Sequence, residues 1–276
     1  MGDLSGKHCL ITGASSGIGR VTGEVLAGRG AKVWLACRDR AKAEPVLRAI
    51  AQAGGNAELV PLDLADLDSV RACASVVLAR DEPLHLLINN AGLAGRRALT
   101  RQGFELTFGV NHLGHFLLTE LLVPRLVQEA HSRVVNVSSI AHYDAPGIDF
   151  SALREPSRWF GVLRAYQVSK LCNVLHAKGL ANRYGERGLH AYSLHPGVIA
   201  SDVWREIPQP VRWFMLRNML SNEDGAKTTL YCATSPAVAD HNGRYYDDCA
   251  EKAPSRLALD SALGDELWQQ SQRFVS

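Results

Sequence analysis

The stretch HCLITGASSGIG at residues 8–19 decides the fold, because it joins a short apolar run to a glycine-rich loop. The run His8–Thr12 is typical of a buried β-strand, and a helical pattern follows from Ile18 onward. Glycines let the backbone turn tightly and approach a ligand closely. The free N–H groups at the start of the helix can then bind an anion such as a pyrophosphate, although a plain turn between strand and helix is the alternative.

The same alternation of strand and helix patterns continues along the chain. The predicted strands are His8–Thr12, Lys32–Cys37, Ala57–Pro61, Leu84–Asn89, Arg133–Val137, His190–His195 and Arg244–Tyr246. The predicted helices are Ile18–Arg29, Ala41–Ala53, Leu67–Arg80, Phe104–Glu129 and Leu163–Tyr184. This order predicts one α/β domain over residues 1–276, a Rossmann-type doubly wound parallel sheet of about seven strands with helices on both faces.

Composition and charge exclude several classes of partner. The net charge of +2 gives no electrostatic basis for binding nucleic acid. There is no signal region and no run of about 18 apolar residues, so we expect a cytoplasmic protein without a membrane anchor. The six cysteines and the ten histidines show no metal-ligand spacing, so we expect reduced thiols and no metal site.

The residues after the second predicted strand indicate which dinucleotide is preferred. Cys37 is followed by Arg38, Asp39 and Arg40. An acidic residue near this position usually holds the ribose 2′-hydroxyl of NAD, whereas an arginine suits the 2′-phosphate of NADP. Arg38, assisted by Arg40, therefore predicts NADP(H), with NAD(H) as the alternative that Asp39 would serve.

A tyrosine and a lysine occupy one helix face. Tyr166 and Lys170 are four residues apart in the last predicted helix, so their side chains lie on the same face. A nearby cation lowers the pKa of a phenol, which makes the phenol a better acid and base near neutral pH. The pair predicts proton transfer to or from a substrate oxygen, and an ordinary Tyr–Lys surface pair is the alternative.

Two further segments end at the same edge of the predicted sheet. Ser139 ends the fifth strand, where its hydroxyl could donate a hydrogen bond to a substrate oxygen. Ser138 is the alternative, because adjacent residues of a strand point to opposite faces and only one of the two serines can face the site. The turn Pro196-Gly197-Val198-Ile199 follows the sixth strand and could present a free backbone amide to a carboxamide.

Together these motifs resemble the short-chain dehydrogenase/reductase family over nearly the whole chain. The matching pieces are T-G-x-x-x-G-x-G at 12–19, Asp63-Leu64, N-N-A-G at 89–92, Pro196-Gly197 and the set Asn111, Ser139, Tyr166 and Lys170. Retinol dehydrogenase-like members are the most similar, on A-C-R-D at 36–39, V-N-H-L-G-H-F at 110–116 and G-R-Y-Y-D-D-C at 243–249.

The resemblance implies a role for each matching residue. Asn111, Ser139, Tyr166 and Lys170 would be catalytic. Asn111 would hold a water that links Lys170 to solvent, or be a structural asparagine bonded to the backbone. The cofactor would contact Gly13, Ser15, Ser16, Gly17, Ile18, Gly19, Arg38, Asp63, Leu64, Asn90, Ala91, Gly92, Tyr166, Lys170, Pro196, Gly197, Val198, Ile199 and Ser201.

From these residues we expect an NADP(H)-dependent oxidoreductase that interconverts a small apolar aldehyde or ketone and its alcohol. The aromatic-rich segment 201–222 would form a lid over the substrate, with Trp159 and Phe160 opposite, or would serve core or subunit packing. The long helices 104–129 and 163–184 resemble those that pair subunits in this family, so a homodimer or homotetramer is expected. The alternatives are a ketoreductase for small or secondary-metabolite ketones and a non-catalytic NADP(H)-binding sensor.

Overall fold

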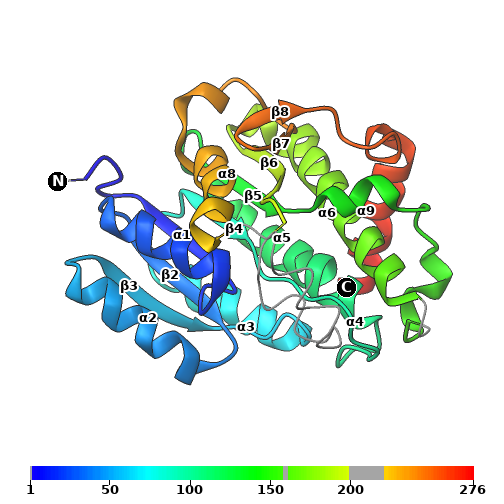
Figure 1. The fold of residues 1–276 in the computed structure, drawn as a ribbon, viewed down its shortest axis with the longest axis horizontal. Coiled ribbons are helices and arrows are strands. Elements are labelled where there is room, and N and C mark those ends of the chain that lie inside the picture. The colour runs from blue at the N-terminus through cyan, green and yellow to red at the C-terminus, as the bar shows by residue number, and fades with distance from the viewer. Residues whose placement is uncertain (1, 158–160, 199–220) are drawn as a thin grey trace.

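A single mixed sheet forms the centre of the computed structural model, which describes residues 2–157, 161–198 and 221–276 (Figure 1). Within these residues the sheet has eight strands in the order β3-β2-β1-β4-β5-β6-β7-β8, and every neighbouring pair is parallel except β7 and β8. The strands are β1 His8–Thr12, β2 Lys32–Cys37, β3 Asn56–Pro61, β4 Leu86–Asn89, β5 Arg133–Val137, β6 His190–His195, β7 Tyr245–Asp247 and β8 Ala250–Lys252.

The predicted doubly wound sheet is confirmed, with one strand more than expected. β8 returns antiparallel to β7 through Asp248 and Cys249, which have φ angles of 50° and 58°. Such a pair of positive φ angles is what a two-residue hairpin turn requires. All three residues of β8 are exposed, so its sequence carries no apolar pattern that would have predicted a strand.

Helices cover both faces of the sheet. The main helices are α1 Gly17–Gly28, α2 Arg40–Gln52, α3 Leu67–Leu78, α4 Leu106–Phe108, α5 Gly114–Leu126, α6 Val162–Tyr184, α8 Asn222–Thr234 and α9 Ser261–Val275. On one face α1, α2 and α8 bury Leu26, Val46 and Cys232 against the strands. On the other face α3, α5, α6 and α9 pack around Leu118 and Trp268. The alternation of strand residues between these two clusters explains the near-continuous apolar runs in the sequence.

The helix predicted over Phe104–Glu129 is interrupted. Glu105 caps the start of α4, where its carboxylate accepts a hydrogen bond of 2.7 Å from the Phe108 N–H. A π-helical turn over Gly109–Leu113 then separates α4 from α5. π-helical turns within a helix often occur at functional sites, and this one contains Asn111.

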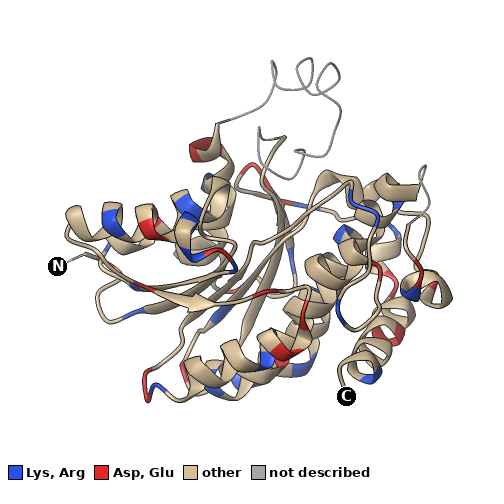
Figure 2. Ribbon diagram, turned by 90° about the horizontal axis from the view of Figure 1, so that it is seen from below, with Lys and Arg blue, Asp and Glu red and all other residues tan. Residues whose placement is uncertain are grey.

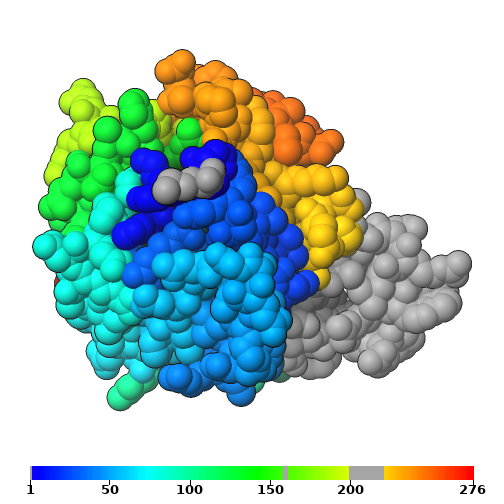
Figure 3. All heavy atoms as spheres, turned by 90° about the vertical axis from the view of Figure 1, so that its left-hand side faces the viewer, coloured from blue at the N-terminus to red at the C-terminus, as the bar shows by residue number. Residues whose placement is uncertain are grey.

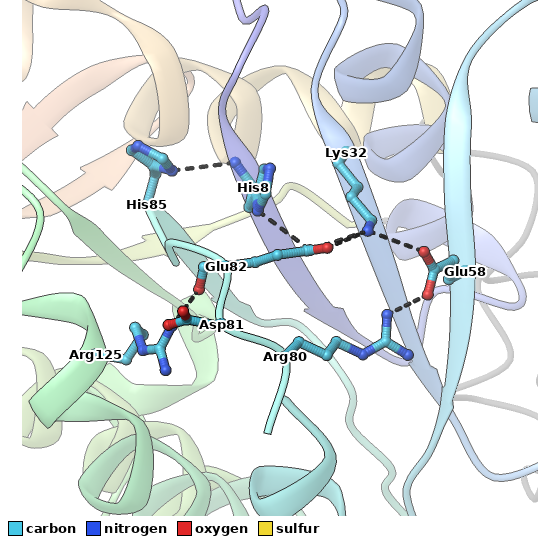
Figure 4. A network of polar contacts seen from close by, with 8 residues as sticks. All are labelled: His8, Lys32, Glu58, Arg80, Asp81, Glu82, His85 and Arg125. Atoms are coloured by element: carbon cyan, nitrogen blue, oxygen red, sulfur yellow. Dashed lines mark hydrogen bonds and ion pairs between the residues drawn. The ribbon is translucent and has the colours of Figure 1, made fainter. Parts of the chain in front are cut away.

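The amino-terminal ends of the strands carry a network of charged side chains (Figure 4). Lys32 Nζ lies 3.0 Å from Glu58 and 2.8 Å from Glu82, and Arg80 forms a second ion pair with Glu58. His8 lies 3.5 Å from Glu82 on the same side of the network. These contacts tie β1, β2 and β3 to the segment before β4.

Elsewhere the described surface mixes charges of both signs. In the view of Figure 2, positions of Lys and Arg and positions of Asp and Glu are both scattered along the helices. Residues from the first third of the chain, blue to cyan in Figure 3, form the edge of the molecule at β3. No helix in the described part of the chain is both long enough and apolar enough to span a membrane.

Candidate active site

A cleft of about 530 Å³ lies at the carboxyl ends of the parallel strands. This is the edge at which open α/β sheets bind their ligands. The structure brings most residues predicted from the sequence into its lining: Gly13, Ser15, Ser16, Gly17, Ile18, Gly19, Arg38, Asp63, Leu64, Asn90, Ala91, Gly92, Ser139, Tyr166, Lys170, Pro196, Gly197 and Val198. Ile199, Ser201, Trp159, Phe160 and the segment 201–220 lie outside the described residues.

The glycine-rich loop has the shape that a pyrophosphate requires. Gly13 and Gly17 have φ angles of 67° and 56°, in the left-handed region that favours glycine. A Cβ at Gly19 would lie 2.4 Å from Asn90 Nδ2 and 2.6 Å from the carbonyl oxygen of Gly13, so only glycine fits there. The side chain of Ser16 does not cap α1, which leaves the N–H groups of the first turn without a side-chain acceptor. The residues present therefore fit a phosphate group at this helix start.

The residues after β2 form a basic rim. Arg38 is 63% exposed and lies 3.9 Å from the carboxylate of Asp63. Asp39 accepts a hydrogen bond of 3.2 Å from the Lys42 N–H and so caps α2, a role that engages its carboxylate. Lys42 also lines the cleft, whereas Arg40, which was expected to assist Arg38, is not among the lining residues. Sequence reasoning missed Lys42, although its spacing of four from Arg38 was the available signal.

The turn after β4 is held to the end of β1. The Asn90 side chain donates to the Thr12 carbonyl at 2.9 Å. Thr12 Oγ1 accepts hydrogen bonds of 3.0 Å from the N–H groups of Asn90 and Ala91. This turn therefore lies beside the glycine-rich loop, and its own polar groups determine its position.

Tyr166, Lys170 and Ser139 meet in the same cleft. Lys170 Nζ lies 5.4 Å from the centre of the Tyr166 ring and donates a hydrogen bond of 3.0 Å to the Val137 carbonyl. The Ser139 side chain is hydrogen-bonded to that of Tyr166. Ser138 instead donates to the Lys170 carbonyl at 2.7 Å, so Ser139 is the serine beside the phenol.

Burial shifts the pKa values of both Tyr166 and Lys170. It raises the pKa of Tyr166 to about 12, and the hydrogen bond from Ser139 only partly opposes the rise. Burial also lowers the pKa of Lys170 to about 8. The phenol pKa therefore moves opposite to the direction expected from Lys170, because burial disfavours the phenolate and the contact that opposes the rise is the hydrogen bond from Ser139. At neutral pH the phenol is protonated and ready to donate.

Asn111 does not line the cleft. Its Oδ1 accepts from the Leu93 N–H at 2.9 Å, and its Nδ2 donates to the Leu93 carbonyl and to Ser169 Oγ, both at 3.0 Å. These contacts match the structural alternative for the side chain. The water that Asn111 was expected to hold stays a prediction.

Comparison with known proteins places the chain in a family. Residues 7–152 match the family model described as short chain dehydrogenase. Dehydrogenase/reductase SDR family member 13 of Homo sapiens is 41% identical over 100% of this chain and 74% of its own length. Retinol dehydrogenase 12 of Homo sapiens is 41% identical over 97% of this chain and 86% of its own length.

A solved structure extends the match to the whole fold. The crystal structure of an uncharacterized protein from Mycobacterium paratuberculosis has a TM-score of 0.81 and 35% identity, and the match covers 100% of this chain and 95% of that chain. A second structure, described as an NAD(P)-dependent gluconate 5-dehydrogenase from Beutenbergia cavernae with NADP bound at low occupancy, has a TM-score of 0.72 and 25% identity over 89% of this chain and 96% of that chain. The predicted resemblance is confirmed: the chain belongs to the short-chain dehydrogenase/reductase family and is an oxidoreductase acting on CH–OH groups.

Proposed function

We propose that this protein uses NADPH to reduce an apolar aldehyde or ketone, and NADP⁺ to oxidise the alcohol in the reverse direction. One observation carries the proposal: the Tyr166 phenol, the buried Lys170 and the Ser139 hydroxyl lie in one cleft with a glycine-rich loop whose backbone leaves room for a phosphate. The enzyme class is that of the family. The cofactor preference and the kind of substrate are inferred from the lining residues.

The preference for NADP(H) rests on charge at the rim of the cleft. Arg38 and Lys42 supply two cations for a 2′-phosphate. Asp39, the residue that could hold the 2′-hydroxyl of NAD, also lines the cleft, but its Oδ1 accepts the Lys42 N–H at the start of α2. The bound NADP of the Beutenbergia cavernae protein shows that a relative of this fold accepts this cofactor.

In the proposed reaction Tyr166 is the proton donor. Its Oη gives a proton to the substrate carbonyl oxygen, and the Ser139 hydroxyl donates a hydrogen bond to the same oxygen. The ammonium of Lys170 stabilises the phenolate that Tyr166 becomes. When bound, the nicotinamide supplies the hydride for reduction and accepts it in oxidation. For oxidation the phenolate takes the alcohol proton.

The preference for an apolar substrate rests on exposed hydrophobic side chains in the lining. Ile140, Leu163 and Val198 are 50%, 55% and 49% exposed and all three line the cleft. Large apolar side chains of this exposure are suited to cover a hydrophobic ligand. Retinal is therefore a first test substrate, given the names of the relatives. The homo-oligomeric state and the cytoplasmic location stay predictions.

The proposal is tested by NADPH consumption with retinal, medium-chain aldehydes and cyclic ketones. We expect turnover with the first two. A clear preference for small cyclic ketones would favour a ketoreductase, and tight NADPH binding without consumption across the panel would favour a sensor.

Titrations with NADPH and NADH test the cofactor preference. Arg38→Glu should weaken binding of NADPH far more than that of NADH. Arg40→Glu is the matched control and should change neither affinity, because Arg40 does not line the cleft. Equal effects of Arg38→Glu on both cofactors would contradict the assignment.

A further inference from the structure

A buried histidine, His115, joins two elements beside the cleft. It lies in α5 and is 2% exposed. Its Nδ1 is 3.0 Å from the Asn111 carbonyl oxygen, and its Nε2 is 2.8 Å from Thr12 Oγ1. One imidazole therefore connects the π-helical turn before α5 to the end of β1.

Each of these two partners holds one end of residues 90–93, which line the cleft. Thr12 Oγ1 accepts from the N–H groups of Asn90 and Ala91. The side chain of Asn111 both donates to and accepts from the backbone of Leu93. These hydrogen bonds connect Thr12 to residues 90–93 and residues 90–93 to Asn111, and His115 connects Asn111 back to Thr12. The contacts therefore form a closed hydrogen-bond circuit.

Counting donors and acceptors fixes the proton on this ring. A carbonyl only accepts, so Nδ1 of His115 carries hydrogen and donates to Asn111. A hydroxyl has one hydrogen and two acceptor sites, and Thr12 Oγ1 already accepts two N–H groups. Thr12 therefore donates to an unprotonated Nε2, because its other acceptor, the Ile88 carbonyl, is farther away at 3.4 Å. Burial lowers the pKa of His115 to about 4, in agreement with a neutral ring.

We infer that His115, as the neutral Nδ1–H tautomer, is a positioning residue that holds residues 90–93 in place between the glycine-rich loop and Lys170. A Cβ at Gly92 would lie 3.5 Å from Lys170 Nζ, so this turn lies directly beside the ammonium. Movement of the turn would change both the cofactor site beside the glycine-rich loop and the surroundings of Lys170. The part of the inference that concerns the cofactor rests on the proposed function.

Two substitutions separate the two contacts of the ring. Asparagine places an amide near the position of Nδ1, so His115→Asn keeps the bond to Asn111 and loses the bond to Thr12. Glutamine reaches the position of Nε2, so His115→Gln keeps an acceptor for Thr12. The matched control is His112→Asn: His112 is also buried, at 1% exposed, but its ring lies 2.9 Å from the hydroxyl of Ser271 in α9, away from Thr12 and residues 90–93.

NADPH titration followed by fluorescence is the first readout. Loss of one buried hydrogen bond predicts that His115→Asn raises the Kd for NADPH about tenfold. His115→Gln should restore a Kd close to that of the wild type, and His112→Asn should leave the Kd unchanged even where it lowers the Tm as much. Wild-type affinity in His115→Asn, or equal losses in His115→Asn and His112→Asn, would overturn the inference.

The second readout is the tautomer itself and needs no cofactor. Nitrogen-15 spectra of the histidine rings should show His115 as the Nδ1–H tautomer at neutral pH, with the signal assigned by its absence in His115→Gln. An Nε2–H tautomer or a charged ring at neutral pH would overturn the inference. If the wild type fails to bind NADPH, the proposed function fails, while these spectra still decide the hydrogen-bond circuit.

Discussion

Replacement of Lys170 by methionine should make the fold more stable while it abolishes turnover. Lys170 is 3% exposed, and its ammonium donates one hydrogen bond to a backbone carbonyl. A buried ammonium with so little compensation costs folding free energy. Methionine matches the length and flexibility of the lysine stem without the charge. Stability and activity should therefore change in opposite directions at this position.

The size of the gain follows from the pKa of the lysine. Burial lowers it from 10.5 to about 8. At about 1.4 kcal/mol for each pKa unit, the protonated side chain costs about 3 kcal/mol in the folded state. The lost hydrogen bond offsets about 1 kcal/mol of this, because the Val137 carbonyl keeps its bond of 3.1 Å from Asn173. The net gain of about 2 kcal/mol corresponds to a rise in Tm of about 4–8 °C.

The gain should depend on pH with a defined sign. Below about pH 8 Lys170 is protonated in the folded protein, so the full cost is present. Between about pH 8 and 10.5 the folded protein has lost this proton and the unfolded chain still holds it, so the stability of the wild type rises with pH relative to the variant. The advantage of Lys170→Met should therefore be largest at neutral pH and be gone before pH 10.5, where the charge no longer costs free energy and only the lost hydrogen bond counts.

Thermal and urea unfolding followed by circular dichroism measure this advantage at each pH. Lys178→Met is the matched control, since Lys178 lies on the same helix but is only partly buried. It should give no comparable gain. A Lys170→Met variant that is no more stable than the wild type at neutral pH, or whose advantage does not shrink as pH rises, would show that the buried ammonium does not destabilise the fold.

Three further predictions concern the pH dependence of the reaction, the glycine-rich loop and the charged network around Lys32. The rate of carbonyl reduction should be flat near neutral pH and fall above about pH 8, as Lys170 loses its proton; a profile flat well past that pH would contradict its role. Gly19→Ala should abolish NADPH binding in a fluorescence titration because its Cβ has no room, whereas Gly28→Ala, with no atom within 4 Å of its Cβ, should bind normally; normal binding by Gly19→Ala would contradict the assigned cradle. Glu82→Gln removes one carboxylate from Lys32 (Figure 4) and should lower the free energy of unfolding by about 1 kcal/mol, with a smaller loss at high salt; a loss independent of salt would show that the contact is not chiefly ionic.

Much of the fold could be predicted because buried parallel strands leave a clear apolar pattern. β1, β2, β5 and β6 have the predicted bounds. The same criterion could not find β8, which is exposed and defined only by its hairpin with β7. The apolar pattern also predicted one helix where the structure has α4 and α5, because the pattern continues through the π-helical turn between them.

The candidate site could be located from the sequence, but its electrostatics could not. The spacing of the motifs predicted that Tyr166, Lys170 and Ser139 meet, and all three line one cleft. The raised pKa of Tyr166 could not be predicted, because it depends on how completely the fold removes water from the phenol. Lys42 and His115 were not predicted as site residues. The spacing of four residues from Arg38 was an available signal for Lys42, whereas no sequence signal reveals that the buried His115 is bonded to Thr12 and Asn111.

We propose that the Tyr166 phenol is the proton donor in a cleft that binds NADPH. The most direct measurement compares Tyr166→Phe with the wild type in NADPH affinity and in NADPH-dependent turnover of an apolar aldehyde. We expect unchanged affinity and a loss of turnover of about 10²–10⁴-fold, the usual contribution of general acid catalysis. Full turnover by Tyr166→Phe with intact NADPH binding would show that the Tyr166 phenol is not the proton donor.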